Sequence, residues 1–373
     1  MRVSELPVVR APNRKIRYLS AGAHSGPAAR TLHPRRRSDA RKRWCQVRPE
    51  MNAEGRDSAP FLPPARPGLQ SRLWRQITRR VFRYMANPAL PPEVRRRRTD
   101  RLIGAAPLPR WTRVEAVTAG GVPAEWITPP GVASDAVLLY FHGGGYAAGS
   151  LATHRITAAQ LAQAAGVRAL LPAYRLAPEH RFPAAPSDAL AVYRWLLEEY
   201  GADPARVVVA GDSAGGGLTI VLAVSARGAG LPLPAALVCI SPWTDLALTG
   251  ASMRTKAGSD PCFRPEDLRL QAREYLGDAD PTQPLASPLY ADLHGLPPLL
   301  AQVGEDELLL DDARRLVERA RAAGVDATLE VWPGMWHVFA LQGMYPESRQ
   351  AMQRLGAFLS HHLAARAGAI PAI

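Results

Sequence analysis

The chain has 373 residues, enough for one large α/β domain or two smaller ones, and 47% of them are hydrophobic, which suffices for a sizeable core. Its formal net charge of +13 is unevenly distributed: residues 1–50 contribute +10, residues 51–100 contribute +7, and the remainder contributes −4. The positive charge therefore belongs to the first hundred residues, and the mildly acidic body argues against a nucleic-acid-binding fold. We expect no nucleic-acid partner.

The three cysteines, Cys45, Cys239 and Cys262, cannot all pair and show no C-x-x-C spacing. This disfavours both a disulfide framework and a zinc site. The first thirty residues contain no apolar core typical of a secretory signal, and no window of about eighteen apolar residues could span a bilayer. We therefore expect a cytoplasmic protein with no metal, no cofactor and no stable membrane insertion. The oligomeric state is not indicated.

Residues 1–65 are rich in Pro, Arg, Ala and Ser without sustained periodicity, and include the basic stretch "HPRRRSDARKR" at 33–43. Such a segment cannot bury enough apolar surface to order itself, so we predict a basic, disordered extension. An arm for nucleic acid or an anionic surface, and an Arg-rich targeting peptide, are the alternatives. Met51 also offers a later start.

A helix is predicted over residues 69–85. Its apolar residues recur at helical intervals, and arginines fill several of the positions between them. The apolar stripe comprises Leu69, Leu73, Ile77, Val81 and Tyr84. Residues 95–98, four arginines, lie on a second candidate helix. A basic amphipathic helix can lie on a membrane, but in a soluble chain its apolar face more often packs against the next domain.

From about residue 106 to the end, short apolar runs alternate with helical patterns, such as those at 188–200 and 311–323. This alternation predicts an α/β domain with a mainly parallel sheet and helices on both faces. Ligands bind such sheets at the carboxyl ends of the strands. The predicted strands are 136–141, 167–173, 206–211, 235–241, 299–304 and 327–332.

Candidate catalytic residues follow several of these runs. Ser213 lies in "GDSAG", which fits G-x-S-x-G, a strained strand-to-helix turn that exposes a nucleophilic hydroxyl; a phosphate-binding turn is the alternative. The run "HGGG" at 142–145 leaves backbone N–H groups open to an oxyanion. Asp306 follows the run at 299–304, and His337 follows the run at 327–332. The chain order Ser213, Asp306, His337 is that of an α/β-hydrolase catalytic triad.

Several motifs of the chain are typical of one known family: "HGGGY", "YRLAPEHRFPAAPSDA" at 174–189, "GDSAGG", "SPWTDL" at 241–246, "SPLYADLHGLPP" at 287–298 and "PGMWHVF" at 333–339. Over residues 69–345 the chain resembles the hormone-sensitive-lipase-like family of α/β-hydrolase esterases. The sequence around "WPGMWHVF" and "GVPAEWITPP" resembles bacterial members related to monoterpene ε-lactone hydrolases more closely than it resembles the animal lipases. Val338 departs from the family, because many relatives have glycine there.

The resemblance implies a serine hydrolase of short- to medium-chain carboxylic esters that forms an acyl-enzyme and needs no cofactor. A lactone hydrolase with the same triad and a non-catalytic ligand-binding receptor on the same fold are the alternatives. The resemblance also implies a helical cap from residues 66–105, with residues 250–290 contributing to it. It places the oxyanion hole at Gly144, Gly145 and Ala214, and we predict that the aromatic residues flanking the site contact substrate: Tyr146, Trp243, Trp336 and Phe339.

Overall fold

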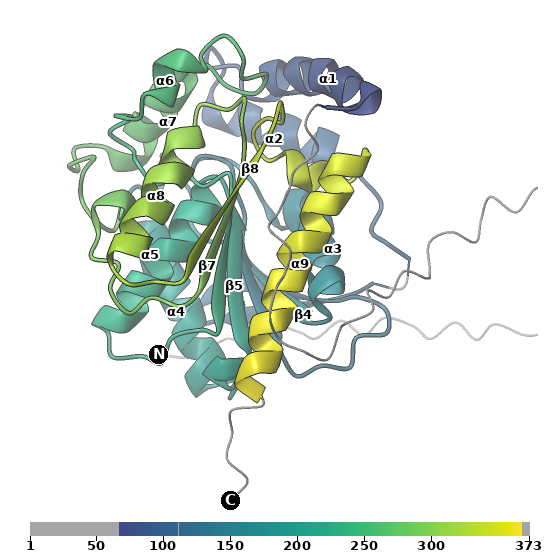
Figure 1. Ribbon diagram of the computed structural model, residues 1–373, viewed down its shortest axis with the longest axis vertical. Coiled ribbons are helices and arrows are strands. Elements are labelled where there is room, and N and C mark those ends of the chain that lie inside the picture. The colour runs from purple at the N-terminus through teal and green to yellow at the C-terminus, as the bar shows by residue number, and fades with distance from the viewer. Residues whose placement is uncertain (1–66, 111, 368–373) are drawn as a thin grey trace, which may run out of the picture. The chain divides into compact units, whose positions relative to one another are not determined.

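The computed structural model describes residues 67–110 and 112–367, all within one compact unit, Ser58–Ile373. The extension predicted over residues 1–65, with Cys45, lies outside the described residues. In the described unit an eight-stranded sheet carries helices on both faces (Figure 1). The predicted α/β fold with a mainly parallel sheet is confirmed.

The strand order in the sheet is β1-β2-β4-β3-β5-β6-β7-β8. β1 pairs with β2, and β2 with β4, in antiparallel fashion; all other neighbours are parallel. The six predicted strands are confirmed, with ends within one residue of those expected. β1 and β2 were not predicted, and β1 has no apolar run because it buries only Ala119. The strands are β1 (Arg113–Ala119), β2 (Val122–Thr128), β3 (Val137–Phe141), β4 (Arg168–Pro172), β5 (Val207–Asp212), β6 (Ala236–Ile240), β7 (Leu299–Gly304) and β8 (Ala327–Trp332).

Two apolar clusters fill the space between the sheet and its helices. α3 (Leu151–Ala165) and α9 (Pro346–Ala367) pack together on one face, and α4 (Ala184–Glu198), α5 (Ala214–Gly228) and α8 (Leu310–Ala322) cover the other. α4 and α8 confirm the helices predicted at 188–200 and 311–323. Four further helices gather at one end of the sheet (Figure 1): α1 (Leu69–Met85), α2 (Pro92–Ile103), α6 (Ser252–Thr255) and α7 (Pro265–Leu276).

α1 begins and ends where the sequence predicts, but its predicted apolar stripe is only partly buried. Leu69 and Leu73 are 83% and 63% exposed, so the expectation that the whole stripe is packed is wrong. Besides apolar residues, the inward face carries polar ones: Ser71 donates to Glu347 and Thr78 donates to Gln342. Within the described residues, no helix has the length and apolar character needed to cross a membrane.

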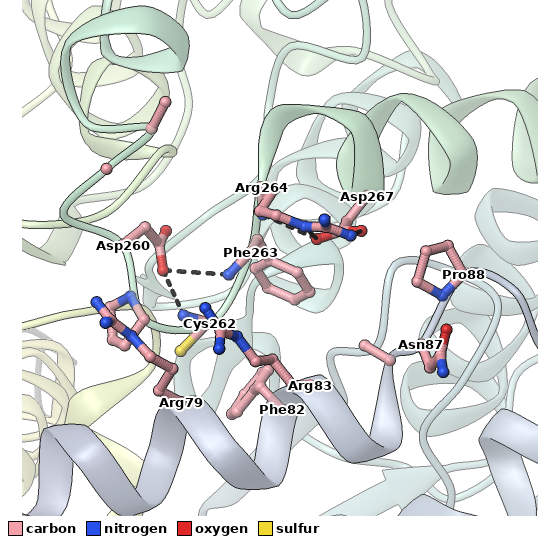
Figure 2. Close-up of a pocket in the computed structure, with 14 residues that line it drawn as sticks. Arg79, Phe82, Arg83, Asn87, Pro88, Asp260, Cys262, Phe263, Arg264 and Asp267 are labelled. Carbon is pink, nitrogen blue, oxygen red and sulfur yellow. Dashed lines mark hydrogen bonds and ion pairs between the residues drawn. The ribbon is translucent and has the colours of Figure 1, made fainter.

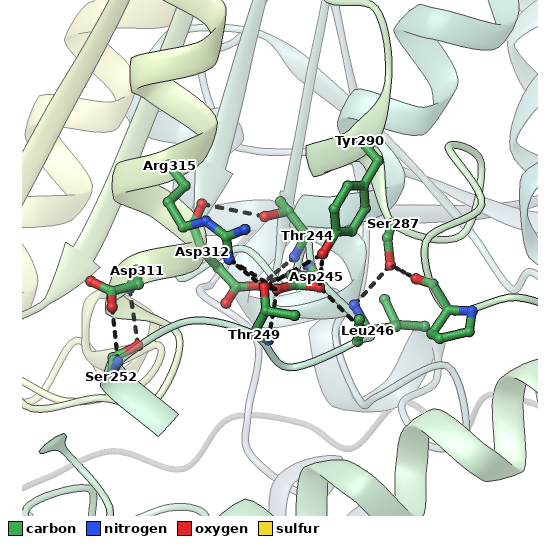
Figure 3. A network of polar contacts seen from close by, with 12 residues as sticks. Thr244, Asp245, Leu246, Thr249, Ser252, Ser287, Tyr290, Asp311, Asp312 and Arg315 are labelled. Carbon is green, nitrogen blue, oxygen red and sulfur yellow. Dashed lines mark hydrogen bonds and ion pairs between the residues drawn. The ribbon is translucent and has the colours of Figure 1, made fainter. Parts of the chain in front are cut away.

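A polar network fixes the loop that follows β6 (Figure 3). Asp312 Oδ2 accepts the N–H groups of Thr244 and Asp245 at 2.8 and 2.9 Å. The Asp245 carboxylate accepts hydrogen bonds from Arg315 at 2.9 Å and from the Tyr290 hydroxyl at 3.0 Å. This loop begins at the carboxyl end of β6, so the network holds it in place beside the residues that follow β5 and β7.

Candidate active site

Ser213 occupies a sharp turn between β5 and α5. Its backbone angles, a φ of 54° and a ψ of −119°, lie in a region that residues other than glycine rarely adopt, so the turn is strained. The flanking glycines permit it: a Cβ on Gly211 would lie 2.2 Å from the Gly215 carbonyl oxygen, and one on Gly215 would lie 2.1 Å from the Phe141 carbonyl oxygen. The G-x-S-x-G pattern thus reflects a close approach of three backbone segments, which holds the serine at the carboxyl end of the sheet.

His337 lies beside Ser213, although 124 residues separate them in the chain. Its Nε2 is 3.0 Å from Ser213 Oγ. The side chain is almost fully buried, and the ring of Phe263 meets the imidazole edge-on with 5.1 Å between centroids. The predicted proximity of Ser213 and His337 is therefore present in the structure.

Glu307, not Asp306, contacts the histidine. Glu307 Oε2 lies 2.7 Å from His337 Nδ1, and the Glu307 side chain is fully buried. The expectation that Asp306 holds His337 is wrong, because the loop after β7 turns the Asp306 side chain away from the site. Asp306 instead forms ion pairs with Arg75 of α1 at 2.8 Å and with Lys256 at 3.6 Å.

Two donors fix the second oxygen of the buried glutamate. Glu307 Oε1 accepts the N–H of Gly304 at 2.6 Å and the hydroxyl of Ser241 at 2.8 Å. Ser241 in turn accepts the N–H of Val338, the residue after the histidine, at 3.0 Å. Burial by itself lowers the pKa of His337, but the hydrogen bond to Glu307 and its charge outweigh burial and raise that pKa above its usual value. Sequence reasoning missed both Glu307 and Ser241; the leucines at 308–310, which lead into the buried start of α8, were the available signal that this part of the loop faces inward.

The glycine loop after β3 offers N–H groups close to Ser213. The N–H of Gly143 is occupied, since it donates to Asp212 Oδ1 at 3.0 Å. Among hydrogen bonds of the described residues, none is donated by the N–H groups of Gly144, Gly145 or Ala214. Gly144 has a φ of +123°, and a Cβ there would lie 2.3 Å from the Ala148 carbonyl oxygen, so glycine is required. The three N–H groups expected to form an oxyanion hole therefore have no hydrogen-bond acceptor among the described residues.

A cavity of about 620 Å³ opens onto Ser213 and His337. Its walls are mainly apolar and come from α1, α2, α3 and the segment after the histidine. The four aromatic residues expected to contact substrate do not line it: Tyr146, Trp243, Trp336 and Phe339 are each at most 1% exposed and pack inside the core. Apolar lining residues include Trp74, Ile77, Val81, Phe82, Met85, Leu102, Ile103, Val338, Leu341 and Met344.

Val338 lines this cavity in a left-handed conformation, with a φ of 49°. A β-branched side chain is unfavourable there, whereas glycine is not. The valine side chain thus forms part of the cavity wall at the cost of local backbone strain, which a glycine at this position would not have.

No group of three or more His, Cys, Asp and Glu side chains that could hold a metal ion occurs in the part of the chain that the structure describes. Cys239 and Cys262 are buried and free.

Comparison with known proteins gives a consistent result. Residues 138–341 match the profile of a family with the alpha/beta hydrolase fold. The chain is 50% identical over 246 residues to an acetyl-hydrolase of Streptomyces hygroscopicus, covering 66% of this chain and 82% of that protein. It is 43% identical over 263 residues to the putative acetyl-hydrolase LipR of Mycobacterium tuberculosis, covering 70% and 85%. A crystal structure of an esterase from the bacterial hormone-sensitive lipase family superimposes with a TM-score of 0.72 at 50% identity, covering 76% of this chain and 97% of that one.

Proposed function

We propose that this carboxylic ester hydrolase, which belongs to the hormone-sensitive-lipase-like family of α/β-hydrolases, cleaves its substrates through an acyl-enzyme formed on Ser213. The observation that carries the proposal is the continuous chain of contacts from Ser213 Oγ through His337 to the buried carboxylate of Glu307, at 3.0 and 2.7 Å. A nucleophile, a base and an orienting acid within hydrogen-bond reach are the requirements of acyl transfer.

In the first half of the reaction, Ser213 Oγ attacks the ester carbonyl carbon while His337 Nε2 takes the hydroxyl proton. Glu307 holds Nδ1–H, which leaves Nε2 free as the acceptor, and it stabilises the imidazolium that forms. The tetrahedral intermediate collapses when the imidazolium returns the proton to the leaving alcohol. In the second half, water attacks the acyl carbon while His337 takes its proton; the second tetrahedral intermediate then collapses as the imidazolium returns that proton to Ser213 Oγ, and the carboxylic acid leaves.

The N–H groups of Gly144, Gly145 and Ala214 form the oxyanion hole of this proposal. These N–H groups donate no hydrogen bond to another described residue. Because α5 begins at Ala214, the positive N-terminal end of the helix dipole also favours negative charge at this place. Hydrogen bonds to an oxyanion strengthen as charge develops in the transition state, which raises kcat.

The proposed substrates are carboxylic esters with short- to medium-chain acyl groups. Val338 narrows the cavity, and the volume of about 620 Å³ suits a small ester. Two relatives, an acetyl-hydrolase and a putative acetyl-hydrolase, support small acyl groups. Lactones remain the second candidate, because ring opening passes through the same tetrahedral intermediate and the two classes differ only in how they fit the cavity.

The experiment that tests the nucleophile is Ser213→Ala, assayed on p-nitrophenyl butyrate. We expect kcat to fall by about 10³- to 10⁶-fold, while the circular dichroism spectrum stays unchanged because the side chain is small. Turnover close to that of the unchanged protein would refute the assignment. A parallel panel of lactones and p-nitrophenyl esters of increasing acyl length would rank the two substrate classes.

We further propose that α1, α2 and the segment around α6 and α7 form the cap, because α1 and α2 supply most of the apolar cavity wall. Starting the chain near Asn87 should change KM or solubility, whereas starting it near residue 60 should not. Full activity from the shorter chain, with salt-sensitive binding of the longer one to anionic vesicles, would favour a membrane role for α1 instead. The cytoplasmic location stays a prediction.

A further inference from the structure

Asp260 is a second buried carboxylate near His337, and it has no role in the reaction described above. It lies in the connection between α6 and α7 and is 8% exposed. Its Oδ1 accepts the N–H groups of Cys262 and Phe263 at 2.7 and 3.3 Å, contacts that Figure 2 shows as dashed lines. Its Oδ2 accepts the N–H of Leu308 at 2.9 Å. One carboxylate thus links the connection between α6 and α7 to the loop after β7.

Both linked segments contact catalytic groups. Leu308 directly follows Glu307, so the Oδ2 contact fixes the backbone beside the acid. The Phe263 ring meets the His337 imidazole edge-on, and the Cys262 thiol donates to the His337 carbonyl oxygen at 3.8 Å. The three hydrogen bonds of Asp260 therefore constrain the acid loop and the wall against the imidazole at the same time.

The charges around Asp260 are of both signs. Burial raises its pKa to about 6, with the charge of Glu307 acting in the same direction, while the charge of His337 and the N–H donors oppose them. Arg75 donates to the carbonyl of Ser259, one residue away. Further ionisable side chains line the same pocket of about 490 Å³ that Asp260 lines (Figure 2): Arg79, Arg83, Cys262, Arg264 and Asp267.

The interaction with His337 is reciprocal. The pKa of His337 is lowered by burial but raised, on balance, by Glu307 and then by the charge of Asp260. Arg264 is engaged by Asp267, with its Nη2 3.1 Å from Asp267 Oδ1, so it is not an ion-pair partner of Asp260. Asp260 thus adds negative charge at the imidazole without itself touching the reacting atoms.

We propose that Asp260 is a positioning residue of the ester hydrolase: it holds the Glu307 loop and the Phe263 wall together, and it supplies a second negative charge that stabilises the imidazolium of His337. This inference rests on the proposed function, because the imidazolium forms only if His337 takes the proton of Ser213. It gives Asp260 two effects of opposite sign. Its charge favours the transition state, in which His337 is charged, but it also favours protonation of free His337, which removes the base.

The test is the pH dependence of kcat and kcat/KM for p-nitrophenyl butyrate, from about pH 5 to about pH 9, in Asp260→Asn. We expect kcat at its maximum to fall roughly tenfold, because negative charge is lost where the imidazolium forms. We expect the acidic limb of kcat/KM to move to lower pH by about half a unit or more, because the same loss lowers the pKa of His337. A purely structural defect would lower kcat without moving that limb.

Asp267→Asn is the matched control. Asp267 is also 8% exposed and lines the same pocket, but its carboxylate is engaged by Arg264 and the N-terminus of α7. Its pH profile should superimpose on that of the unchanged protein. Should Asp260→Asn fail to fold, Asp260→Ser removes the same charge and leaves room for water, and the same displacement of the limb is expected.

The proposal is overturned if the acidic limb of a folded, uncharged Asp260 variant superimposes on that of the unchanged protein, or if Asp267→Asn moves it equally. These outcomes differ from a failure of the proposed function, in which Ser213→Ala would keep its turnover. If Ser213→Ala is inactive and the limbs coincide, only the role of Asp260 is lost.

Discussion

Glu307 bonds to Nδ1 of His337 at 2.7 Å and is fully buried, while its neighbour Asp306 is partly exposed and pairs with Arg75 of α1. Two consecutive acidic residues therefore have different partners. The first prediction separates them: Glu307→Gln should lower kcat by about 10³- to 10⁴-fold, because an amide does not hold the imidazole in the required tautomer or stabilise the imidazolium.

Asp306→Asn, the matched change one residue earlier, should keep kcat within about threefold, since it alters only the partly exposed ion pairs with Arg75 and Lys256. Both variants are to be assayed on one soluble p-nitrophenyl ester, with thermal unfolding as the measure of folding. Loss of activity in Asp306→Asn alone would contradict the assignment of the acid.

The second prediction concerns Arg75, which joins α1 to the body of the protein. Its guanidinium binds the Asp306 carboxylate and the carbonyls of Gly334 and Ser259. Because α1 supplies much of the cavity wall, Arg75→Ala should raise KM several-fold and leave kcat within about twofold. Arg72→Ala, an exposed position on the same helix, is the control. Effects of Arg75→Ala and Asp306→Ala that simply add in a double-mutant cycle would show that the ion pair does not couple the two segments.

The third prediction uses the strained valine in the cavity. Val338→Gly should raise kcat/KM for longer acyl chains relative to butyrate by roughly tenfold, because it widens the cavity. Val338→Ala widens it as well but keeps a Cβ at a φ of 49°, so only the glycine variant relieves strain, worth about 1 kcal/mol. Unchanged chain-length ratios in both variants would show that Val338 does not limit the acyl group.

The sequence anticipated the parts of the site that depend on backbone shape. Ser213 and the glycine loop were predictable because the turn and the N–H groups need small residues at fixed positions, and His337 because it follows the last strand. Glu307 was not, because three acidic residues follow β7 in succession and strand periodicity says nothing about which of them the loop turns inward. The burial of Trp336 and Phe339 was missed for a related reason: both lie within two residues of the histidine in the chain, yet their side chains are fully buried in an apolar core cluster.

The fourth prediction concerns the polar network that fixes the loop after β6 (Figure 3). Burial raises the pKa of Asp312 well above its usual value, so the folded protein binds that proton more tightly than the unfolded chain. The stability that Asp312 contributes is therefore present below its unfolded-state pKa and is lost as pH rises through the folded-state pKa. Asp312→Asn stays neutral and still accepts the N–H groups of Thr244 and Asp245.

The melting temperature of Asp312→Asn should thus rise by a few degrees relative to that of the unchanged protein as the pH rises from about 5 to about 9. Thermal unfolding followed by circular dichroism measures it. Asp311→Asn, a partly exposed neighbour that bonds to Ser252, is the control. A difference that stays constant with pH would contradict a raised pKa of Asp312 in the folded protein.

Mass spectrometry of the protein, quenched in acid during turnover of p-nitrophenyl acetate, would detect an acyl-enzyme on Ser213 directly. We expect a mass increase of one acetyl group, located to the peptide that contains Ser213 and absent from Ser213→Ala. In Glu307→Gln the same adduct should form much more slowly. Rapid turnover without any adduct on that peptide, or an adduct that persists on another residue in Ser213→Ala, would show that Ser213 is not the nucleophile.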